Sequence, residues 1–192
     1  GFASTQQQNT GSPTPIEAVI TPTLPPGRQP MRLPADYRDT FEHYITVERG
    51  DAMARRVFIS PEAVDAVREG LPIPDGTIIV IEAFHAALDE DGVPLRDEQG
   101  RYVLGEMEPE VHMAERRSTW MIQDLAASAH LNGWNFDAFD MATGVSNQGV
   151  RNDCFSCHET ADHRDFVFTN RFLQAYAQTG DLQYDFCRLP ER

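Results

Sequence analysis

Residues 74–84 read Pro-Asp-Gly-Thr-Ile-Ile-Val-Ile-Glu-Ala-Phe, and the part from Thr77 to Phe84 is the most apolar stretch of the chain. Pro-Asp-Gly is a typical turn sequence, because proline presets one backbone angle and glycine tolerates the other. The run that follows is short and rich in β-branched residues, which favour strands. We therefore expect residues 77–84 to form a central, buried strand.

On the N-terminal side of this strand the sequence predicts two further strands and two helices. Serine before proline and glutamate is a typical helix start, and glycine a typical helix end. The expected elements are a short helix over 36–43, strands over 43–49 and 54–59 joined by a turn at 50–51, and a helix from Ser60 to Gly70.

On the C-terminal side, strands are expected over 110–116 and 133–139, a helical turn over 154–158, and a helix over 170–178 stopped by Gly180. The acidic residues 89–100 do not match the EF-hand spacing, so we interpret them as a solvated hairpin. Short strands with a few helices, in no βαβ order, indicate an α+β fold with a small antiparallel sheet.

Residues 1–34 are rich in Pro, Gln and Thr and cannot bury enough apolar area to fold alone. We expect an extended N-terminal tail over 1–34, lying on the domain or on a partner, and a folded domain over 35–192. The first residue is glycine rather than methionine, which suggests that a signal peptide was removed.

The formal net charge is −14, and all sixteen basic residues are arginine. Such an acidic chain is unlike proteins that bind nucleic acid. No apolar run reaches the roughly 18 residues of a membrane span, so no direct membrane span is expected.

Cys154-Phe155-Ser156-Cys157-His158 is a C-x-x-C-H motif. Three-residue spacing places both thiols on one side of a helical turn, where they can add to the two vinyl groups of haem. The adjacent His158 imidazole is then a suitable proximal iron ligand. A thioredoxin-like pair lacks its βαβ context here, and a zinc site lacks further ligands. The motif predicts one covalently attached haem c, and hence a periplasmic or extracellular location.

A third cysteine, Cys187, remains outside the motif. It is either a buried free thiol or a bridge to another chain, and we favour the buried thiol.

Beyond the motif, the chain resembles the cytochrome P460 family and its NO-binding relatives, the cytochromes c′-beta. The resemblance rests on segments spread over residues 35–169, which are His43-Tyr44, Arg55 to Ile59, Pro74 to Thr77, Gly133-Trp134, Cys154 to His158, and Asp165 to Thr169. It implies a single haem c enclosed by an antiparallel sheet, often in a homodimer. It also implies a distal side open to NO or hydroxylamine.

In one respect the chain departs from the hydroxylamine oxidisers of that family. They carry a lysine that bonds to the porphyrin, and this chain has none; we align Ile81 or Glu82 with it. The resemblance also implies a distal acidic group and a distal arginine. The candidates are Glu106, Glu108, Glu110 and Glu115 for the acid, and Arg55 or Arg56 for the arginine.

Histidine or methionine would serve as a sixth iron ligand. The candidates are His43, His85, His112, Met113, His130 and His163, with His112, Met113 and His85 the better placed. The family resemblance instead favours an open, apolar distal site lined by residues such as Ile81, Phe84 and Phe58.

The sequence favours a mono-haem electron carrier, docked on a redox partner or larger electron-transfer complex through its tail. The alternative is a five-coordinate haem protein that binds or converts NO or hydroxylamine, which as an enzyme would be an oxidoreductase of small nitrogen compounds. A purely structural haem is a third interpretation. No catalytic residue is assigned.

Overall fold

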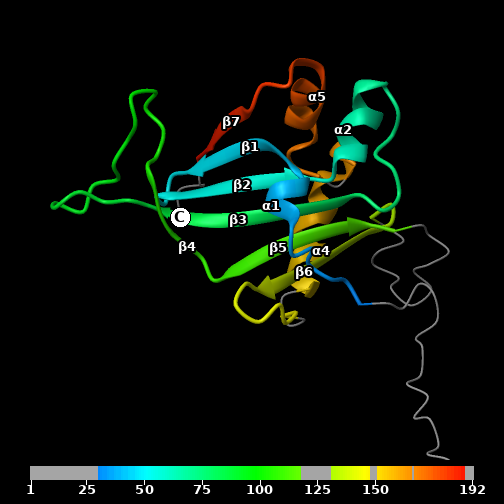
Figure 1. Cartoon of the computed structure of the whole chain (residues 1–192), viewed down its shortest axis with the longest axis horizontal. Helices are drawn as coiled ribbons and strands as arrows, with labels where there is room; N and C mark the ends of the chain where they lie inside the picture. The colour runs from blue at the N-terminus through cyan, green and yellow to red at the C-terminus, as the bar shows by residue number, and fades with distance from the viewer. Residues whose placement is uncertain (1–29, 118–130, 148–150, 166, 189–192) are drawn as a thin grey trace, which may run out of the picture.

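The computed structural model describes residues 30–117, 131–147, 151–165 and 167–188. Seven strands of this part form one sheet in the order β6-β5-β3-β2-β1-β7, and β4 pairs with β3 outside this path (Figure 1). Their bounds are β1 Glu42–Arg49, β2 Met53–Ile59, β3 Ile78–Ala86, β4 Leu104–Met107, β5 Glu110–Arg116, β6 Trp134–Asp140 and β7 Gln183–Cys187. The predicted central strand is confirmed as β3.

All strand pairs are antiparallel except β1 with β7, which run parallel. The predicted α+β class is confirmed, with a mixed rather than a purely antiparallel sheet. The strands β4 and β7 were not predicted. Both are short, and neither is buried enough to show an alternating apolar pattern.

The helices of the described residues are α1 (Tyr37–Thr40), α2 (Pro61–Arg68), α4 (Arg151–His158), the 3₁₀ helix η3 (Glu159–Arg164) and α5 (Asn170–Thr179). Each predicted helix is confirmed within a few residues. Gly180 ends α5 in the left-handed conformation, with φ of 73°. Ser60 precedes α2 as predicted, but its hydroxyl accepts a hydrogen bond from the Ile78 amide at 3.1 Å instead of capping the helix.

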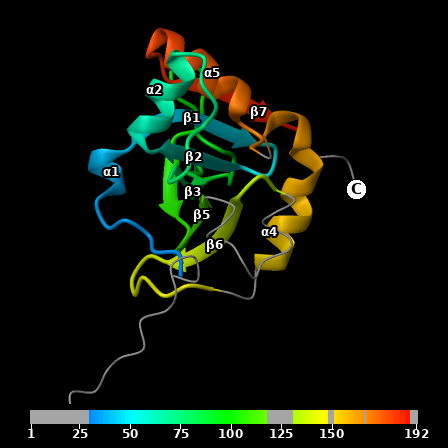
Figure 2. The same cartoon turned by 90° about the vertical axis from the view of Figure 1, so that its right-hand side faces the viewer.

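The two faces of the sheet are covered by different elements. Figure 2 shows α1 on one side of the sheet and α4 beside β6 on the other. Helix α5 packs on α2 and β1. Because side chains alternate along a strand, consecutive residues of each strand contribute to opposite cores.

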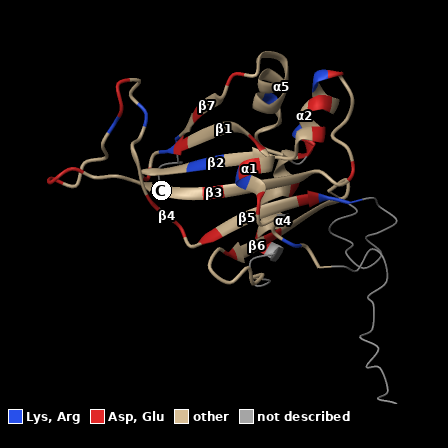
Figure 3. Ribbon diagram, viewed as in Figure 1, with Lys and Arg blue, Asp and Glu red and all other residues tan. Residues whose placement is uncertain are grey.

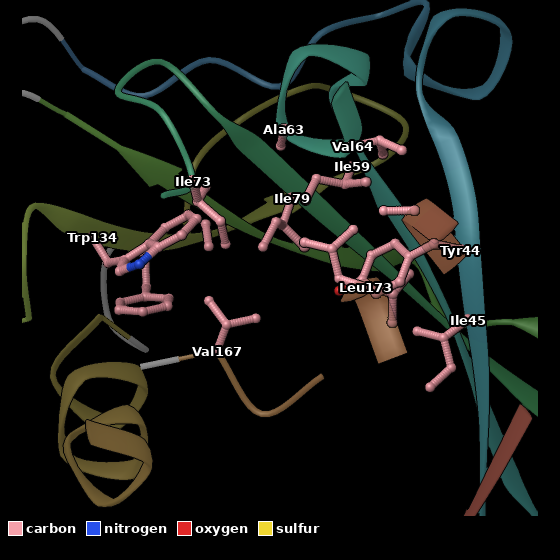
Figure 4. Packing of buried hydrophobic residues seen from close by; sticks show 14 of the residues in the cluster. Tyr44, Ile45, Ile59, Ala63, Val64, Ile73, Ile79, Trp134, Val167 and Leu173 are labelled. Carbon is pink, nitrogen blue, oxygen red and sulfur yellow. The ribbon is translucent and has the colours of Figure 1, made fainter. Parts of the chain in front are cut away.

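The larger core lies on the side of α4 and α5 (Figure 4). It is formed by side chains that are almost fully buried, among them Tyr44, Ile45, Ile59, Ile79, Trp134, Val167 and Leu173. Tyr44 is fully buried, and its hydroxyl lies 2.5 Å from the Thr169 hydroxyl, which ties β1 to the segment before α5.

The smaller core lies under α1, on the opposite face. It contains Met31, Tyr37, Phe58, Val80 and Phe139, among others. Met31 is buried here, so packing of the domain begins a few residues before Ala35. Residues 1–29 of the predicted tail lie outside the described residues.

Residues 87–103 form an arm that extends away from the sheet (Figure 1). Antiparallel bridges join Leu88 to Pro94 and Arg96 to Tyr102, which confirms the predicted hairpin character of the acidic loop. Within it, the Asp89 carboxylate accepts backbone hydrogen bonds from residues 91 and 93. Figure 3 shows both charge signs along this arm.

None of the helices in the described ranges has the length and apolar character that a membrane crossing requires.

Candidate haem site

The C-x-x-C-H motif occupies the last turns of α4, which packs on β6. At its end, the His158 ring stacks on Phe136 of β6, with ring centroids 4.0 Å apart and planes inclined by 28°. Phe168 contacts the same imidazole, at 5.1 Å between centroids. These two aromatic rings position the imidazole between the helix and the sheet.

Cys154, Cys157 and His158 line a cavity of about 740 Å³ between α4 and the sheet. This volume is in the range of cofactor pockets, which are usually 300–1,000 Å³. The motif therefore faces an internal space in the described part of the molecule, not only the solvent.

The surface of the cavity is mostly apolar, and aliphatic side chains of four strands form part of its sheet wall. Val47 of β1, Val57 of β2, Ile79 and Ile81 of β3 and Ala114 of β5 contribute to it. These residues share one face because they occupy alternate positions, and the register joins Val57 to Ile81 and Ile79 to Ala114. The wall is suited to an apolar, flat ligand such as a porphyrin.

The segment that follows the motif closes another side of the cavity. Asp165 adopts the left-handed conformation, with φ of 51°, and reverses the chain after η3. Its carboxylate accepts hydrogen bonds from Arg116 at 3.1 Å and from Asn132 at 2.9 Å. These bonds attach the turn to the sheet and bring Val167 and Phe168 to the cavity.

The three thiols differ in their surroundings. Burial, followed by the nearby Asp137 and Asp153 carboxylates, raises the pKa of the Cys154 thiol, while Cys157 is exposed. Cys187 is also exposed and lines the cavity, so the prediction of a buried thiol is wrong. The reason is that β7 lies at the edge of the sheet.

Four arginines line the cavity, in a chain with a net charge of −14. They are Arg49, Arg55, Arg164 and Arg171. The Nε atom of Arg49 is buried and has no hydrogen-bond partner among the described residues. Cations beside an apolar wall match a ligand that has an apolar body and carboxylate groups.

The residues thus fit haem c. The aliphatic wall accommodates the macrocycle, the arginines match its propionates, and the thiols and imidazole lie on one helix end. This combination has the features that a c-type haem site requires. The profile of the family described as Cytochrome P460 matches residues 34–169, well over half of the chain, and the chain belongs to this family of haem c proteins. A search of curated proteins finds no match.

The two candidates for the distal arginine lie on opposite faces of the sheet, and so do two of the residues predicted to line the distal site. Arg55 and Ile81 line the cavity, whereas Arg56 and Phe84 do not. The Arg56 guanidinium lies over the Phe84 ring, 5.1 Å from its centroid, because both residues have the opposite parity on β2 and β3. Phe58 packs with Tyr37 in the smaller core for the same reason.

Of the candidate sixth ligands, His112 lines the cavity with an exposed side chain. Met113 borders the cavity but is 2% exposed and packs in the smaller core. His85 lies 2.6 Å from Glu108, and His43 stacks on Phe58, both away from the cavity lining. His163 is exposed beside Asp162, and His130 lies outside the described residues.

None of the predicted acidic candidates is among the residues that line the cavity. Glu108 contacts His85, Glu110 lies 3.5 Å from His112, and Glu115 pairs with Arg117 at 2.9 Å; Glu106 is exposed. Of the two positions aligned with the missing lysine, Ile81 faces the cavity and Glu82 is buried on the other side, bonded to Tyr37.

Three lining residues on β1 and β2 were not predicted from the sequence, namely Arg49, Val47 and Val57. A signal was available, because these residues and Arg55 occupy alternate positions on two paired strands and so share one face of the sheet. Arg164 and Arg171, on η3 and α5, gave no such signal, because their place depends on how the helices pack on the sheet.

Proposed function

We propose that the protein is a mono-haem cytochrome c whose iron has an open distal side and binds NO or a related small nitrogen compound. The observation that carries this proposal is the aliphatic sheet wall of the cavity. Val47, Val57, Ile79, Ile81 and Ala114 have no group that ligates iron. When bound, the haem supplies an iron that takes a diatomic ligand at its free position.

His158 is the proposed proximal ligand, and its contacts with Phe136 and Phe168 orient the ring. The side chains of the aliphatic wall offer no hydrogen-bond partners to water. A neutral ligand such as NO costs little to transfer into such a space, whereas an unpaired charge costs much more.

The test is the visible spectrum of the reduced holoprotein with and without CO or NO. We expect a high-spin ferrous spectrum that shifts when either gas is added. Sharp low-spin bands that do not respond to the gases would contradict the proposal, and would indicate an internal sixth ligand. His112 is the first residue to substitute in that case, because it lines the cavity.

Covalent attachment is part of the proposal, since Cys154 and Cys157 both line the cavity beside His158. Replacing both cysteines with alanine should make the haem extractable with acidified acetone, while wild-type haem remains with the protein. Cys187→Ala is the matched control and should retain the haem. Haem that stays covalent in the double variant would rule out attachment through the motif.

Electron transfer is a second candidate function, and the exposure of Cys157 favours it. A thioether at an exposed thiol would place one haem edge near the surface, where an electron can pass to a partner protein. Rapid reduction by a small protein donor, with no response to CO or NO, would favour this role over ligand binding.

We also propose that the protein is exported and acts with a second copy or a redox partner. Haem attachment through C-x-x-C-H supports export, since in bacteria it occurs outside the cytoplasmic membrane. The edge strand β7 exposes Tyr184 and Phe186, at 42% and 45%, which supports a protein contact there. Sedimentation of the holoprotein would reveal a dimer.

A further inference from the structure

Strand β7, at the edge of the sheet in the described part of the chain, carries an exposed aromatic surface. The side chains of Tyr184 and Phe186 are 42% and 45% exposed. Arg101, from the arm, lies over the Tyr184 ring, with its guanidinium carbon 3.8 Å from the ring centroid. We call Tyr184, Phe186 and Arg101 the edge patch.

Strand register places the edge patch on the face of the sheet opposite to the haem cavity. Tyr184 pairs with Thr46 of β1, and Thr46 pairs with Arg56 of β2. Arg56 in turn pairs with Glu82, which is bonded to α1, so this row lies on the side of the smaller core. Cys187, of the other parity on β7, lines the cavity. A haem in the cavity therefore leaves the edge patch uncovered.

The chemistry of the edge patch suits a proline-rich segment. Such segments adopt the extended polyproline II conformation and are recognised by exposed aromatic rings. Their backbone has no internal hydrogen bonds, so its carbonyl oxygens remain available to a donor beside the rings. The Arg101 guanidinium is such a donor, since it has several N–H groups and stacks on Tyr184.

The chain itself contains a segment of this kind close to the domain. Residues 22–26 read Pro-Thr-Leu-Pro-Pro, with the PxxP spacing that aromatic-lined surfaces recognise. The described part of the chain begins at Pro30, and Met31 is already buried in the smaller core. The proline-rich segment therefore joins the domain on the same face of the sheet that carries the edge patch.

The length of chain before Pro30 is sufficient to reach the edge patch. Met31 belongs to one cluster with Val80 of β3 and Val111 of β5, and β7 is three strands from β3 and four from β5. Since neighbouring strands are about 4.8 Å apart, the distance across the sheet is roughly 15–20 Å. A polyproline II segment rises about 3.1 Å per residue and crosses this distance in about five to seven residues. Counted back from Pro30, the segment 22–26 lies at this distance.

We propose that residues 22–26 dock on the edge patch of their own chain. The inference does not depend on the proposed haem function, because the edge patch faces away from the cavity. A short tether gives an effective concentration on the order of millimolar, so a contact with a Kd of about 1 mM is strong enough to be occupied. A partner protein that uses the same aromatic side chains must first displace the tail.

The test is brief trypsin treatment of the full-length holoprotein, with loss of residues 1–28 followed by mass spectrometry. Arg28 is the first basic residue of the chain and lies two residues after the segment. In Tyr184→Ser with Phe186→Ser, we expect the initial rate of cleavage at Arg28 to rise about fivefold, because the docked state is lost.

A variant of the tail gives a second, independent measurement. Pro22→Ala with Pro25→Ala should raise the cleavage rate as much as the aromatic variant, after division by the rate of a free peptide of the same sequence. Combining the two variants should give no further increase, because both remove the same contact. Additive increases would overturn the proposal.

Leu88→Ser with Val93→Ser is the matched control, since both side chains are 55% exposed and lie on the arm rather than on β7. It should change the rate less than about twofold. An equal increase in the control would show general loosening and overturn the proposal. An unchanged rate in the aromatic variant would also overturn it, and would leave the edge patch to a partner protein.

If the aromatic variant does not accumulate, the tail variant decides, because it leaves the described domain unaltered. Protection of Arg28 in the wild type should be the same from about 1 to 100 μM protein, since the tether fixes the local concentration. Protection that increases with protein concentration would assign the surface to the tail of a second copy, and would overturn docking within one chain.

Discussion

At the scale of single residues, the backbone next to the cavity depends on positions where only one residue type fits. Gly133 precedes β6, the strand that carries Phe136, and has φ of +86°. A β-carbon at this position would overlap the carbonyl oxygen of Arg117, which is backbone and cannot move aside easily. The glycine is thus required by both conformation and space.

We predict that Gly133→Ala lowers the free energy of unfolding by about 2–4 kcal/mol, measured by urea denaturation. Gly144→Ala is the control. Gly144 also has a positive φ, of +68°, but nothing lies within 4 Å of an added β-carbon, so about 1 kcal/mol is expected. Equal losses in the two variants would show that the overlap has no energetic effect.

The residues of the motif were predicted from the sequence, because their chemistry is local and their spacing is fixed by helix geometry. The other cavity residues were predicted only in part. Arg55 and Ile81 were named, but so were Arg56 and Phe84, which lie on the opposite face. A sequence shows that side chains alternate along a strand, but it does not show which alternate positions face the cavity. The burial of Cys187 was misjudged because its strand, β7, was not predicted.

At the scale of elements, α1 is a single turn that is held on the sheet by one buried carboxylate. Glu82 of β3 is 1% exposed. It accepts hydrogen bonds from the Tyr37 hydroxyl at 2.6 Å and from Arg38 Nε at 2.5 Å. Burial and the Glu82 carboxylate raise the pKa of Tyr37, so this hydroxyl remains a donor across the ordinary pH range.

We predict that Tyr37→Phe destabilises the protein by about 1–3 kcal/mol in thermal or urea unfolding, because the buried Glu82 carboxylate loses one of its donors. Adding Glu82→Gln to Tyr37→Phe should restore part of the loss, since the buried group is then neutral. Thr40→Ala, at the exposed end of α1, should cost less than about 0.5 kcal/mol. No recovery in the double variant would argue against the carboxylate as the cause.

The helices and most strands were predictable, because turn residues and periodicity are encoded locally. The pairing of β1 with its second neighbour, β7, was not predictable in this way. β7 pairs with a strand far away in the sequence, in parallel, and no local pattern specifies such a partner.

At the scale of the whole molecule, a half-buried histidine in an acidic chain affects how stability varies with pH. His43 of β1 stacks on Phe58 and lies 3.1 Å from the Ile45 carbonyl oxygen and 3.0 Å from the Thr46 hydroxyl. Burial, and then the Arg56 cation, lowers its pKa, while the Ile45 carbonyl and the Glu82 carboxylate oppose the shift.

A histidine whose pKa is lower in the folded state must take up its proton on unfolding when the pH is below its unfolded value of about 6.5. Its contribution is therefore present above that pH and lost as the pH falls. We predict a free energy of unfolding that decreases from pH 7 to pH 5, and a smaller decrease in His43→Gln. Comparison of the two proteins at each pH cancels the effect of the common net charge. Parallel curves would contradict the prediction.

The parallel pairing of β1 with β7 has a consequence for the synthesis of the protein. β1 begins at Glu42 and β7 ends at Cys187, so the cavity is bounded by strands from nearly opposite ends of the described chain. During vectorial emergence of the polypeptide, the attachment cysteines appear some time before the last boundary strand. The pocket is therefore incomplete while the thiols are already accessible. Under the proposed covalent attachment, this interval would let a haem-ligating enzyme reach the thiols before the fold closes.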